Sequence, residues 1–548
     1  MLIFQLILFF LISLISLITF AGYGQILISN YKKNFLESTF FGFLVLGFVV
    51  TGLHFFIKIS IFLTTTIIII GLLLALKNFF FLIKKIKKET LIFLLIFLLL
   101  TPIYISQKYH EDLGYYHLPY IINLHYEKII FGLANSNTAF LHNSIWLNIM
   151  SLFYTKYSFD FITVPTFLLY FVFIIFFLKE TLYFDKKNLS HYLTIVSLFY
   201  FILKFTRISE FGNDLPAVLF SILSIFFFFK FNECKSLNDK LYSFFCNFSF
   251  ALFAVLIKFS CIPVILLTIY LLSKNFSILK KEIFKLNYFI VYFLGLFFFI
   301  QQFIYSGCFL FPSKFSCLKV SWFNVDFLSL SERLQVINKS YSEARHLFTK
   351  EEFLNDFNWL PFWFQRNYSE ILEHLFTMIL PLILLFLILK RDVKKKQINF
   401  KEKSIFIFFL IVGFIFWLNF SPVYRFGVVY FLIFIFLATI FIYKTNNFSK
   451  RVFLSLVFIS LVFNFTKNTL RISKEDRVFL GIKKIQNNFY KYPNSQSNFV
   501  SVYKPDIKKN MHNGWQGRLC WDITFLCSHN EINVNKMYSY LIINKSNN

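Results

Sequence analysis

The sequence is poor in charge and in the two residues that most often interrupt helices. Charged residues make up 15% of the 548 residues, against ~25% in an ordinary soluble domain, and there are only 16 glycines and 11 prolines. Acidic residues are the scarcest, at 28 against 55 lysines and arginines. Together with the low count of seven cysteines, this composition excludes a soluble globular enzyme, a disordered protein and a disulfide-dense secreted scaffold.

Apolar residues fill the chain instead, at 57% of the total. A membrane-spanning helix needs about 20 consecutive apolar residues, and about fourteen segments approach that requirement. We therefore predict an all-α polytopic membrane protein. The predicted spans are residues 2–20, 37–56, 60–76, 91–107, 161–178, 189–205, 215–230, 242–257, 260–273, 287–305, 372–389, 404–420, 424–443 and 452–466.

The net charge of +27 would suggest nucleic-acid binding in a soluble protein, but here the basic residues lie in short runs between apolar segments. Such runs anchor the cytoplasmic ends of helices, so we expect no nucleic-acid partner. If the basic loop 84–88 lies in the cytoplasm, the alternation of membrane spans places the other short basic loops in the cytoplasm as well. Three long regions then lie outside: 108–160, 306–371 and the tail 467–548. We expect the tail to form a small α/β segment.

The segment 109–120 is the richest in chemically active side chains. Glu111 and Asp112 are adjacent carboxylates at the predicted outer end of a membrane helix, and the surrounding loop holds four of the ten histidines. Such a pair can act as a general base or bind a divalent cation. The structural alternative is a helix N-terminus with acidic capping residues.

Six short motifs occur in sequence along the chain, from residue 112 to residue 527. Their order resembles that of a bacterial group within the GT-C glycosyltransferases, which are polytopic enzymes that use polyprenyl-phosphate-linked sugars. The resemblance runs from about residue 91 to the end and leaves the helices of 1–90 outside the usual core of 91–466. The motifs are residues 112–119, 207–216, 258–260, 306–312, 422–427 and 520–527.

The resemblance implies a GT-C-like fold in which Asp112 is the catalytic base, with Glu111 beside it. Asp214 and Glu210 form a second acidic group. In some members of the superfamily such a residue helps to bind a metal ion, so Mg²⁺ or Mn²⁺ at Asp112 and Asp214 is left open. The alternative for Asp214 is an ordinary loop carboxylate paired with Arg207.

Arg425 lies at the outer end of a predicted helix, where its guanidinium matches the oxygens of a phosphate. The resemblance places Arg425 on the carrier's phosphate and makes Lys258 a second candidate. The alternatives are a snorkelling anchor for Arg425 and a helix-flanking lysine for Lys258. Tyr116 and His117 complete the predicted substrate-binding residues.

Two pairs of cysteines fall in regions that we place outside the cytoplasm, where disulfides persist. We expect Cys308 to pair with Cys317 and Cys520 with Cys527; they would be free thiols if the assigned sidedness is wrong. The aromatic stretch 359–364 is expected to rest on the membrane surface.

The resemblance, together with the predicted topology, thus implies a glycosyltransferase of the bacterial inner membrane. It would move a sugar, with inversion, from a polyprenyl-phosphate donor to a lipid or glycan acceptor on the periplasmic side. An O-antigen polymerase or ligase is an alternative that would depend on basic residues rather than carboxylates. A transporter or flippase is another, but we see neither internal repeats nor many broken helices.

Overall fold

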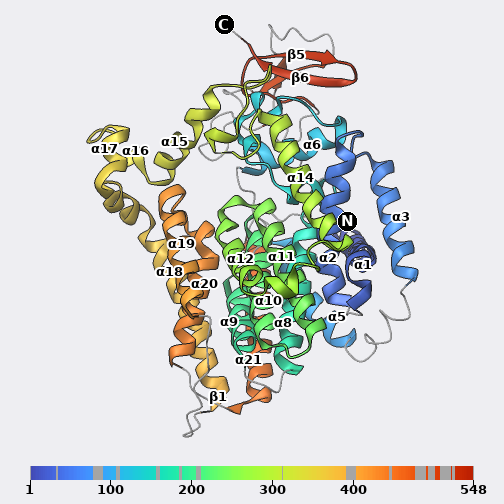
Figure 1. Cartoon of the computed structure of the whole chain (residues 1–548), viewed down its shortest axis with the longest axis vertical. Coiled ribbons are helices and arrows are strands. Elements are labelled where there is room, and N and C mark those ends of the chain that lie inside the picture. The colour runs from blue at the N-terminus through green and yellow to red at the C-terminus, as the bar shows by residue number, and fades with distance from the viewer. Residues whose placement is uncertain are drawn as a thin grey trace.

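The structure is a computed structural model of the whole chain (Figure 1). It describes residues 2–31, 35–77, 90–106, 112–155, 161–183, 188–204, 212–311, 313–390, 403–442, 447–474, 489–491, 500–505, 520 and 525–546. All statements below concern these residues. Glu111 and Glu210 of the predicted acidic groups lie outside them.

Helices dominate the described residues, because long apolar segments can satisfy their backbone hydrogen bonds internally only as helices. The α-helices are α1 (Leu2–Ile28), α2 (Phe35–His54), α3 (Ile61–Lys77), α5 (Thr90–Ile105), α6 (Leu118–Tyr126), α7 (Ile145–Ser151), α8 (Val164–Tyr183), α9 (Leu189–Lys204), α10 (Asp214–Glu233), α11 (Leu237–Ile257), α12 (Ile265–Lys274), α13 (Phe276–Leu279), α14 (Leu286–Ser306), α15 (Asp326–Asn338), α16 (Tyr341–Ala344), α17 (Lys350–Leu354), α18 (Leu360–Ile388), α19 (Lys403–Phe420), α20 (Tyr424–Ile442) and α21 (Lys450–Lys474).

Each of the fourteen predicted apolar segments coincides with a helix; the segment 260–273 combines the 3₁₀ turn η5 (Phe259–Val264) with α12. Seven helices among the described residues are long and apolar enough to cross a membrane: α1, α2, α8, α10, α11, α14 and α21. The chain is therefore an all-α, multi-pass membrane protein in its main architecture.

The three N-terminal helices pack closely on the remaining bundle. Close approach of α1 to α2 depends on glycine, because a Cβ on Gly42 would lie 1.9 Å from the Phe20 carbonyl oxygen. Small residues permit such backbone contact between membrane helices. From α2, Thr51 accepts a hydrogen bond of 2.9 Å from Asn148 of α7. These helices are thus part of the same packed core as the rest of the bundle.

The three long regions predicted to share one side lie together at one end of the molecule (Figure 1). The Phe131 amide donates to the Leu541 carbonyl at 2.9 Å, which joins the first region to the tail. Asn135 donates to the Trp322 carbonyl at 2.9 Å, which joins the first region to the second. At the opposite end, β1 (Leu389–Lys390) pairs antiparallel with β2 (Asn447–Phe448), and both border segments predicted to face the cytoplasm.

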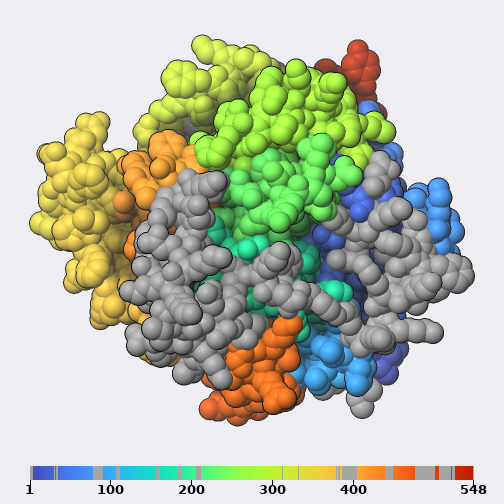
Figure 2. All heavy atoms as spheres, turned by 60° about the horizontal axis from the view of Figure 1, so that its bottom comes forward, coloured from blue at the N-terminus to red at the C-terminus, as the bar shows by residue number. Residues whose placement is uncertain are grey.

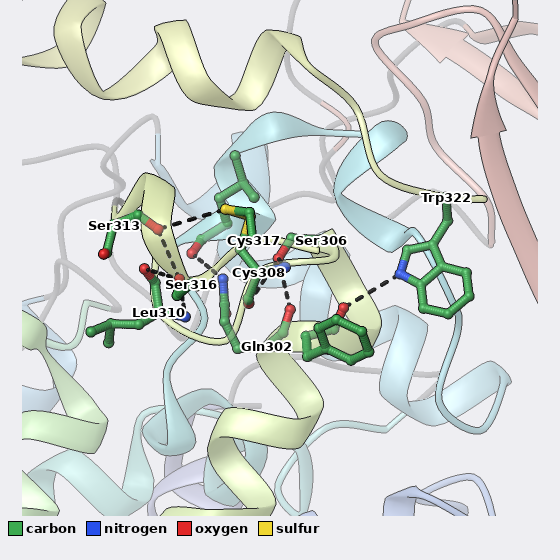
Figure 3. Close-up of a disulfide and its surroundings, with 10 residues drawn as sticks. Gln302, Ser306, Cys308, Leu310, Ser313, Ser316, Cys317 and Trp322 are labelled. Atoms are coloured by element: carbon green, nitrogen blue, oxygen red, sulfur yellow. Dashed lines mark hydrogen bonds between the residues drawn. A yellow bond between two sulfur atoms is a disulfide. The ribbon is translucent and has the colours of Figure 1, made fainter. Parts of the chain in front are cut away.

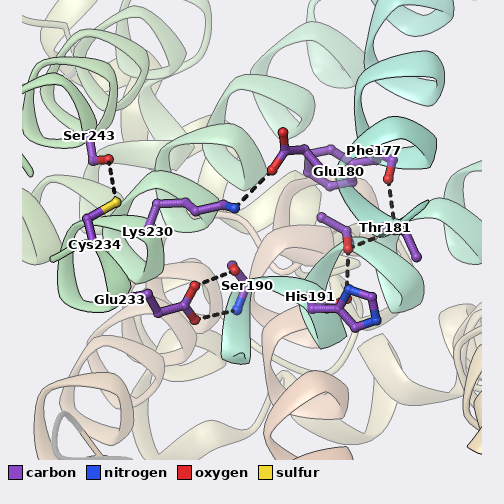
Figure 4. Close-up of polar contacts among 10 residues, drawn as sticks. Phe177, Glu180, Thr181, Ser190, His191, Lys230, Glu233, Cys234 and Ser243 are labelled. Atoms are coloured by element: carbon purple, nitrogen blue, oxygen red, sulfur yellow. Dashed lines mark hydrogen bonds and ion pairs between the residues drawn. The ribbon is translucent and has the colours of Figure 1, made fainter. Parts of the chain in front are cut away.

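Polar side chains link α8, α9 and α10 near their ends remote from the long regions (Figure 4). Lys230 Nζ lies 2.9 Å from Glu180 Oε2. The carboxylate of Glu233 accepts hydrogen bonds from the amide and the hydroxyl of Ser190, at 2.9 and 2.5 Å. Ser190 is in the first turn of α9, so Glu233 satisfies an amide that has no partner within the helix.

The described part of the tail contains strands but no helix after Lys474. The strands are β3 (Phe489–Lys491), β4 (Tyr503–Pro505), β5 (Ile532–Met537) and β6 (Tyr540–Lys545). β3 pairs antiparallel with β4, and β5 with β6 in the register Ile532 to Lys545. The expectation of a mixed α/β segment therefore holds for its strands only, within the residues described.

Helices α15 to α17 form an arm that leads into the start of α18 and stands out from the bundle (Figures 1 and 2). The arm belongs to the long region 306–371. Trp359 and Trp363 at its end are buried, with 2% and 7% of their surface exposed. These two side chains pack inward, whereas Leu360 and Phe364 are 42% and 57% exposed, so contact of residues 359–364 with the membrane surface stays a prediction.

Substitution of Gly42 by alanine tests the close helix contact. We expect Gly42→Ala to lower the melting temperature of the detergent-purified protein, because the added methyl group overpacks α1 against α2 at a cost of about 1–3 kcal/mol. Gly295→Ala is the matched control, since its Cβ would meet only Leu252, at 3.7 Å. An equal effect of the two changes would contradict the proposed contact.

Candidate functional site

Four of the predicted site residues converge, each from the end of a helix. Asp112 immediately precedes the π-helical turn η2 (Leu113–His117), and Asp214 is the first residue of α10. Lys258 follows the last residue of α11, and Arg425 is the second residue of α20. Residues that are far apart in the sequence thus form one site at the end of the molecule that carries the long regions.

Ion pairs connect these four side chains. Lys258 Nζ forms a short ion pair with Asp214 Oδ1. Arg425 Nε lies 3.4 Å from Asp214 Oδ2, and Arg425 Nη2 lies 4.0 Å from Asp112 Oδ2. Two carboxylates and two cations therefore balance in charge, as partly buried charges require.

The two acidic residues are not held alike. In the described ion pairs Asp214 faces both cations, and it also benefits from its position at the N-terminus of α10, where the helix dipole favours a carboxylate. The contact of Asp112 with Arg425 is the longer one. Arg425 is the most exposed of the four, with 42% of its side chain accessible against 21% for Lys258.

Aromatic rings border the cations. Lys258 Nζ lies 3.4 Å from the centre of the Phe426 ring, and the Arg425 guanidinium carbon lies 5.3 Å from the same centre. A cation over an aromatic face gains electrostatic stabilisation that does not depend on a carboxylate. Phe426 therefore gives both cations a contact that remains if their carboxylate partners are displaced.

Tyr116 and His117 also belong to this site. Burial, followed by the negative charges of Asp112 and Asp214, raises the pKa of Tyr116 well above its usual value. The phenol is therefore protonated at neutral pH and can donate a hydrogen bond. The buried His117 ring lies 4.1 Å from the Tyr116 ring. The structure thus places Tyr116 close to both carboxylates and His117 next to Tyr116.

His142 is a site residue that the sequence analysis did not select. The surrounding protein and then the Lys258 ammonium lower the pKa of His142 below its usual value, while Asp112 acts in the opposite direction; the residue is nevertheless exposed to solvent. The imidazole is therefore neutral at pH 7 and lies within the field of both groups. Its only sequence signal was membership of the histidine-rich loop 108–160.

A second polar group flanks Arg425 on α18. The His374 ring stacks on Tyr424, with ring centres 3.5 Å apart, and His374 Nε2 lies 3.6 Å from Glu370. Lys204, the last residue of α9, pairs with Glu373 at 2.8 Å. No sequence motif indicated these residues, because they come from apolar helices without a recognisable spacing.

Two indole groups hold the turn that leads into Arg425. Trp363 Nε1 donates to the Pro422 carbonyl at 2.7 Å, and Trp417 Nε1 donates to the Val423 carbonyl at 2.8 Å. The two tryptophan rings are themselves 5.8 Å apart in an edge-to-face arrangement. These two indoles, from the first turns of α18 and the end of α19, thus fix the backbone from which Arg425 projects.

A buried hydrogen-bond network stabilises the region 108–160 next to the candidate site. The Tyr120 hydroxyl contacts Asn143 and Asn148 at 2.8 and 2.9 Å, and Gln301 accepts from both asparagines at 3.0 and 3.2 Å. Gln301 also donates to Tyr305 at 3.1 Å. This network joins α6, α7 and α14, so the helix that follows His117 is firmly placed.

Both expected cysteine pairs are joined as disulfides. Cys308–Cys317 closes a loop directly after α14, where the Cys308 amide donates to the Ser306 hydroxyl at 3.0 Å (Figure 3). Cys520–Cys527 lies in the tail. Each bond rigidifies a segment of the end that carries the candidate site.

The described side chains give little support for a metal ion. No group of three or more His, Cys, Asp or Glu residues among them is arranged to hold one. Asp112 and Asp214, the two residues considered as ligands, instead share Arg425. Glu111 and Glu210 lie outside the described residues, so a divalent metal at Asp112 and Asp214 stays a prediction.

A family model described as "Domain of unknown function (DUF8201)" matches residues 4–432, and the chain belongs to this family. The match includes the three N-terminal helices and ends within α20, shortly after Arg425. Comparison with the curated proteins and with the solved structures finds no match.

A double-mutant cycle measures the Lys258–Asp214 ion pair. We expect Lys258→Met and Asp214→Asn each to lower the melting temperature, and the double variant to be no less stable than the worse single variant. The pair is only about a quarter exposed, so we expect a coupling of about 1–2 kcal/mol, below that of a fully buried pair.

The matched control is the exposed pair Lys314–Glu332, with an N–O distance of 2.6 Å. Its coupling should be at most about 0.5 kcal/mol, since solvent screens exposed pairs. Additive effects of the Lys258 and Asp214 changes would show that these side chains do not stabilise each other.

Proposed function

We propose that this protein is a GT-C-type glycosyltransferase that moves a sugar from a polyprenyl-phosphate donor to a lipid or glycan acceptor. The observation that supports the proposal is the convergence of Asp112, Asp214, Lys258 and Arg425 at one end of an apolar helix bundle. A carboxylate can accept a proton from an alcohol, and paired cations can bind a phosphate. Both requirements of the reaction are thus present in one place.

In the proposed reaction Asp112 is the general base. The acceptor hydroxyl oxygen attacks the anomeric carbon, its proton passes to the Asp112 carboxylate, and the bond from that carbon to the phosphate oxygen breaks. The electron pair of the broken bond leaves with the polyprenyl phosphate. A single displacement of this kind inverts the anomeric configuration.

Arg425 and Lys258 hold the phosphate in this proposal. Arg425 suits the role because it is the most exposed of the four charged side chains and presents several donors in one plane. Lys258 contributes a second positive charge, while its pairing with Asp214 keeps the ammonium in position. The leaving phosphate already carries its own charge, so the mechanism needs no separate strong acid.

The finer details of membrane topology also belong to the proposal. All fourteen helical segments cross the inner membrane of a bacterium, and the end that carries the candidate site faces the periplasm. This arrangement follows from the basic short loops at the opposite end. Tyr116, His117 and His142 would contact the sugar or the acceptor, since they border Asp112.

Sugar transfer in membranes that contain the protein tests the proposal. With labelled polyprenyl-phosphate sugars as donors and a lipid extract as acceptor, we expect Asp112→Asn to reduce transfer by about 10²- to 10⁴-fold, the usual contribution of a general base. Arg425→Lys should raise the donor KM, because lysine lacks the planar fork. Glu332→Gln, which removes an exposed carboxylate of the arm, is the control.

Normal transfer by Asp112→Asn, with equal amounts of folded protein, would exclude Asp112 as the base. Dependence on Arg425 alone would favour a polymerase or ligase of the O-antigen type, in which basic residues dominate. Movement of the donor across the membrane without transfer would favour a flippase.

A further inference from the structure

The turn that follows Asp112 has an unusual hydrogen-bond pattern. Residues Leu113–His117 form a π-helical turn, in which the Leu118 amide donates to the Leu113 carbonyl five residues earlier. Such turns are rare in proteins, and those that occur often lie at functional sites. The turn places Tyr116 and His117 beside Asp112, so its geometry determines the shape of the candidate site.

Proline at position 119 leaves this turn short of a donor. Proline has no N–H group, so position 119 cannot donate to the carbonyl of Gly114, five residues before it, or of Tyr115, four residues before it. A buried carbonyl without a partner costs free energy, and Gly114 is buried. The turn therefore needs donors from elsewhere in the chain.

Both carbonyls receive them. Asn137 Nδ2 donates to the Tyr115 carbonyl at 2.9 Å. The Cys520 amide donates to the Gly114 carbonyl at 2.8 Å, although Cys520 is some 400 residues later in the chain. Cys520 is only 1% exposed and is joined to Cys527.

The residues after Cys527 attach to the same loop. The His529 amide donates to the Ser136 carbonyl at 2.9 Å, and the Ser528 hydroxyl contacts the same carbonyl at 3.2 Å. The His529 ring lies 4.9 Å from the Tyr115 ring. We refer to Cys520, Cys527, Ser528 and His529 as the C-terminal clamp.

We propose that the C-terminal clamp positions the catalytic turn: it supplies the hydrogen bond that Pro119 cannot and so fixes Asp112, Tyr116 and His117 relative to Arg425. Its residues are positioning residues. The catalytic consequence rests on the proposed function, whereas the structural consequence does not. The clamp lies beyond residue 432, where the family match ends, so this part of the site comes from outside the matched region.

Hydrogen exchange measured by mass spectrometry tests the clamp in the full-length protein in lipid nanodiscs. The variant Cys520→Ser/Cys527→Ser removes the disulfide of the clamp. We expect peptides that cover residues 112–118 to exchange roughly tenfold faster in this variant. Cys308→Ser/Cys317→Ser is the matched control, because it removes a disulfide of similar loop length without touching the turn.

A rescue variant addresses the role of proline directly. Adding Pro119→Ala to Cys520→Ser/Cys527→Ser returns an N–H group to the turn, and we expect exchange of residues 112–118 to slow again. Equal exchange in the two disulfide variants, or no slowing by Pro119→Ala, would overturn the proposal.

Transfer assays on the same variants separate this proposal from the proposed function. Loss of the clamp should lower kcat while the donor KM stays close to normal, because the phosphate contacts of Arg425 and Lys258 remain. If no variant and not even the wild type transfers sugar, but exchange changes as expected, the positioning role stands and the glycosyltransferase proposal fails. An equal loss of kcat in both disulfide variants would contradict a specific role of the clamp.

Discussion

The ion pairs among Asp112, Asp214, Lys258 and Arg425 are the constraint on which the end of the molecule with the long regions depends. Charges near a low-dielectric bundle are tolerated when they are paired, and each of these four comes from a different helix end. Removing one charge leaves another without full compensation. The ends of α10, α11 and α20 and the turn before α6 are therefore fixed relative to one another by electrostatics as well as by packing.

Backbone groups at helix ends lack partners within the helix. Several hydrogen bonds from other segments supply partners for the carbonyls beside the candidate site. Indole N–H groups of Trp363 and Trp417 occupy the carbonyls before α20. The Cys520 amide and the Asn137 side chain donate to the carbonyls of Gly114 and Tyr115, which Pro119 cannot serve as a donor. The tail looks like an addition to a helical bundle, yet it satisfies the backbone next to the charged residues, as do the tryptophans of α18 and α19. They are thus coupled to the site through hydrogen bonds rather than through direct contact with a substrate.

The sequence predicted the helices well, because a bilayer-length apolar run has few alternatives to a helix. It also predicted that the three long regions lie together, since the basic runs separate the two ends. Asp112 and Arg425 were selected from ordered motifs, but their contact was not foreseen. That contact depends on which helices pack against each other. The apolar helix faces are so uniformly rich in phenylalanine and isoleucine that the sequence does not indicate which helices are neighbours. His374 was missed for the same reason, whereas His142 had only its place in the histidine-rich loop 108–160 as a signal.

Sharing of Arg425 between two carboxylates has a consequence for the proposed reaction. The contact to Asp112, at 4.0 Å, is longer than that to Asp214, at 3.4 Å, so under the proposed function we expect an arriving phosphate to displace Asp112 more readily. Asp214 keeps Lys258 and therefore stays neutralised. Donor binding would thus release the base at the moment when a sugar is in place. Before that moment Asp112 is paired with the Arg425 guanidinium. Arg425 would then pair with Asp112 while the site is empty and bind the donor phosphate when the donor is present.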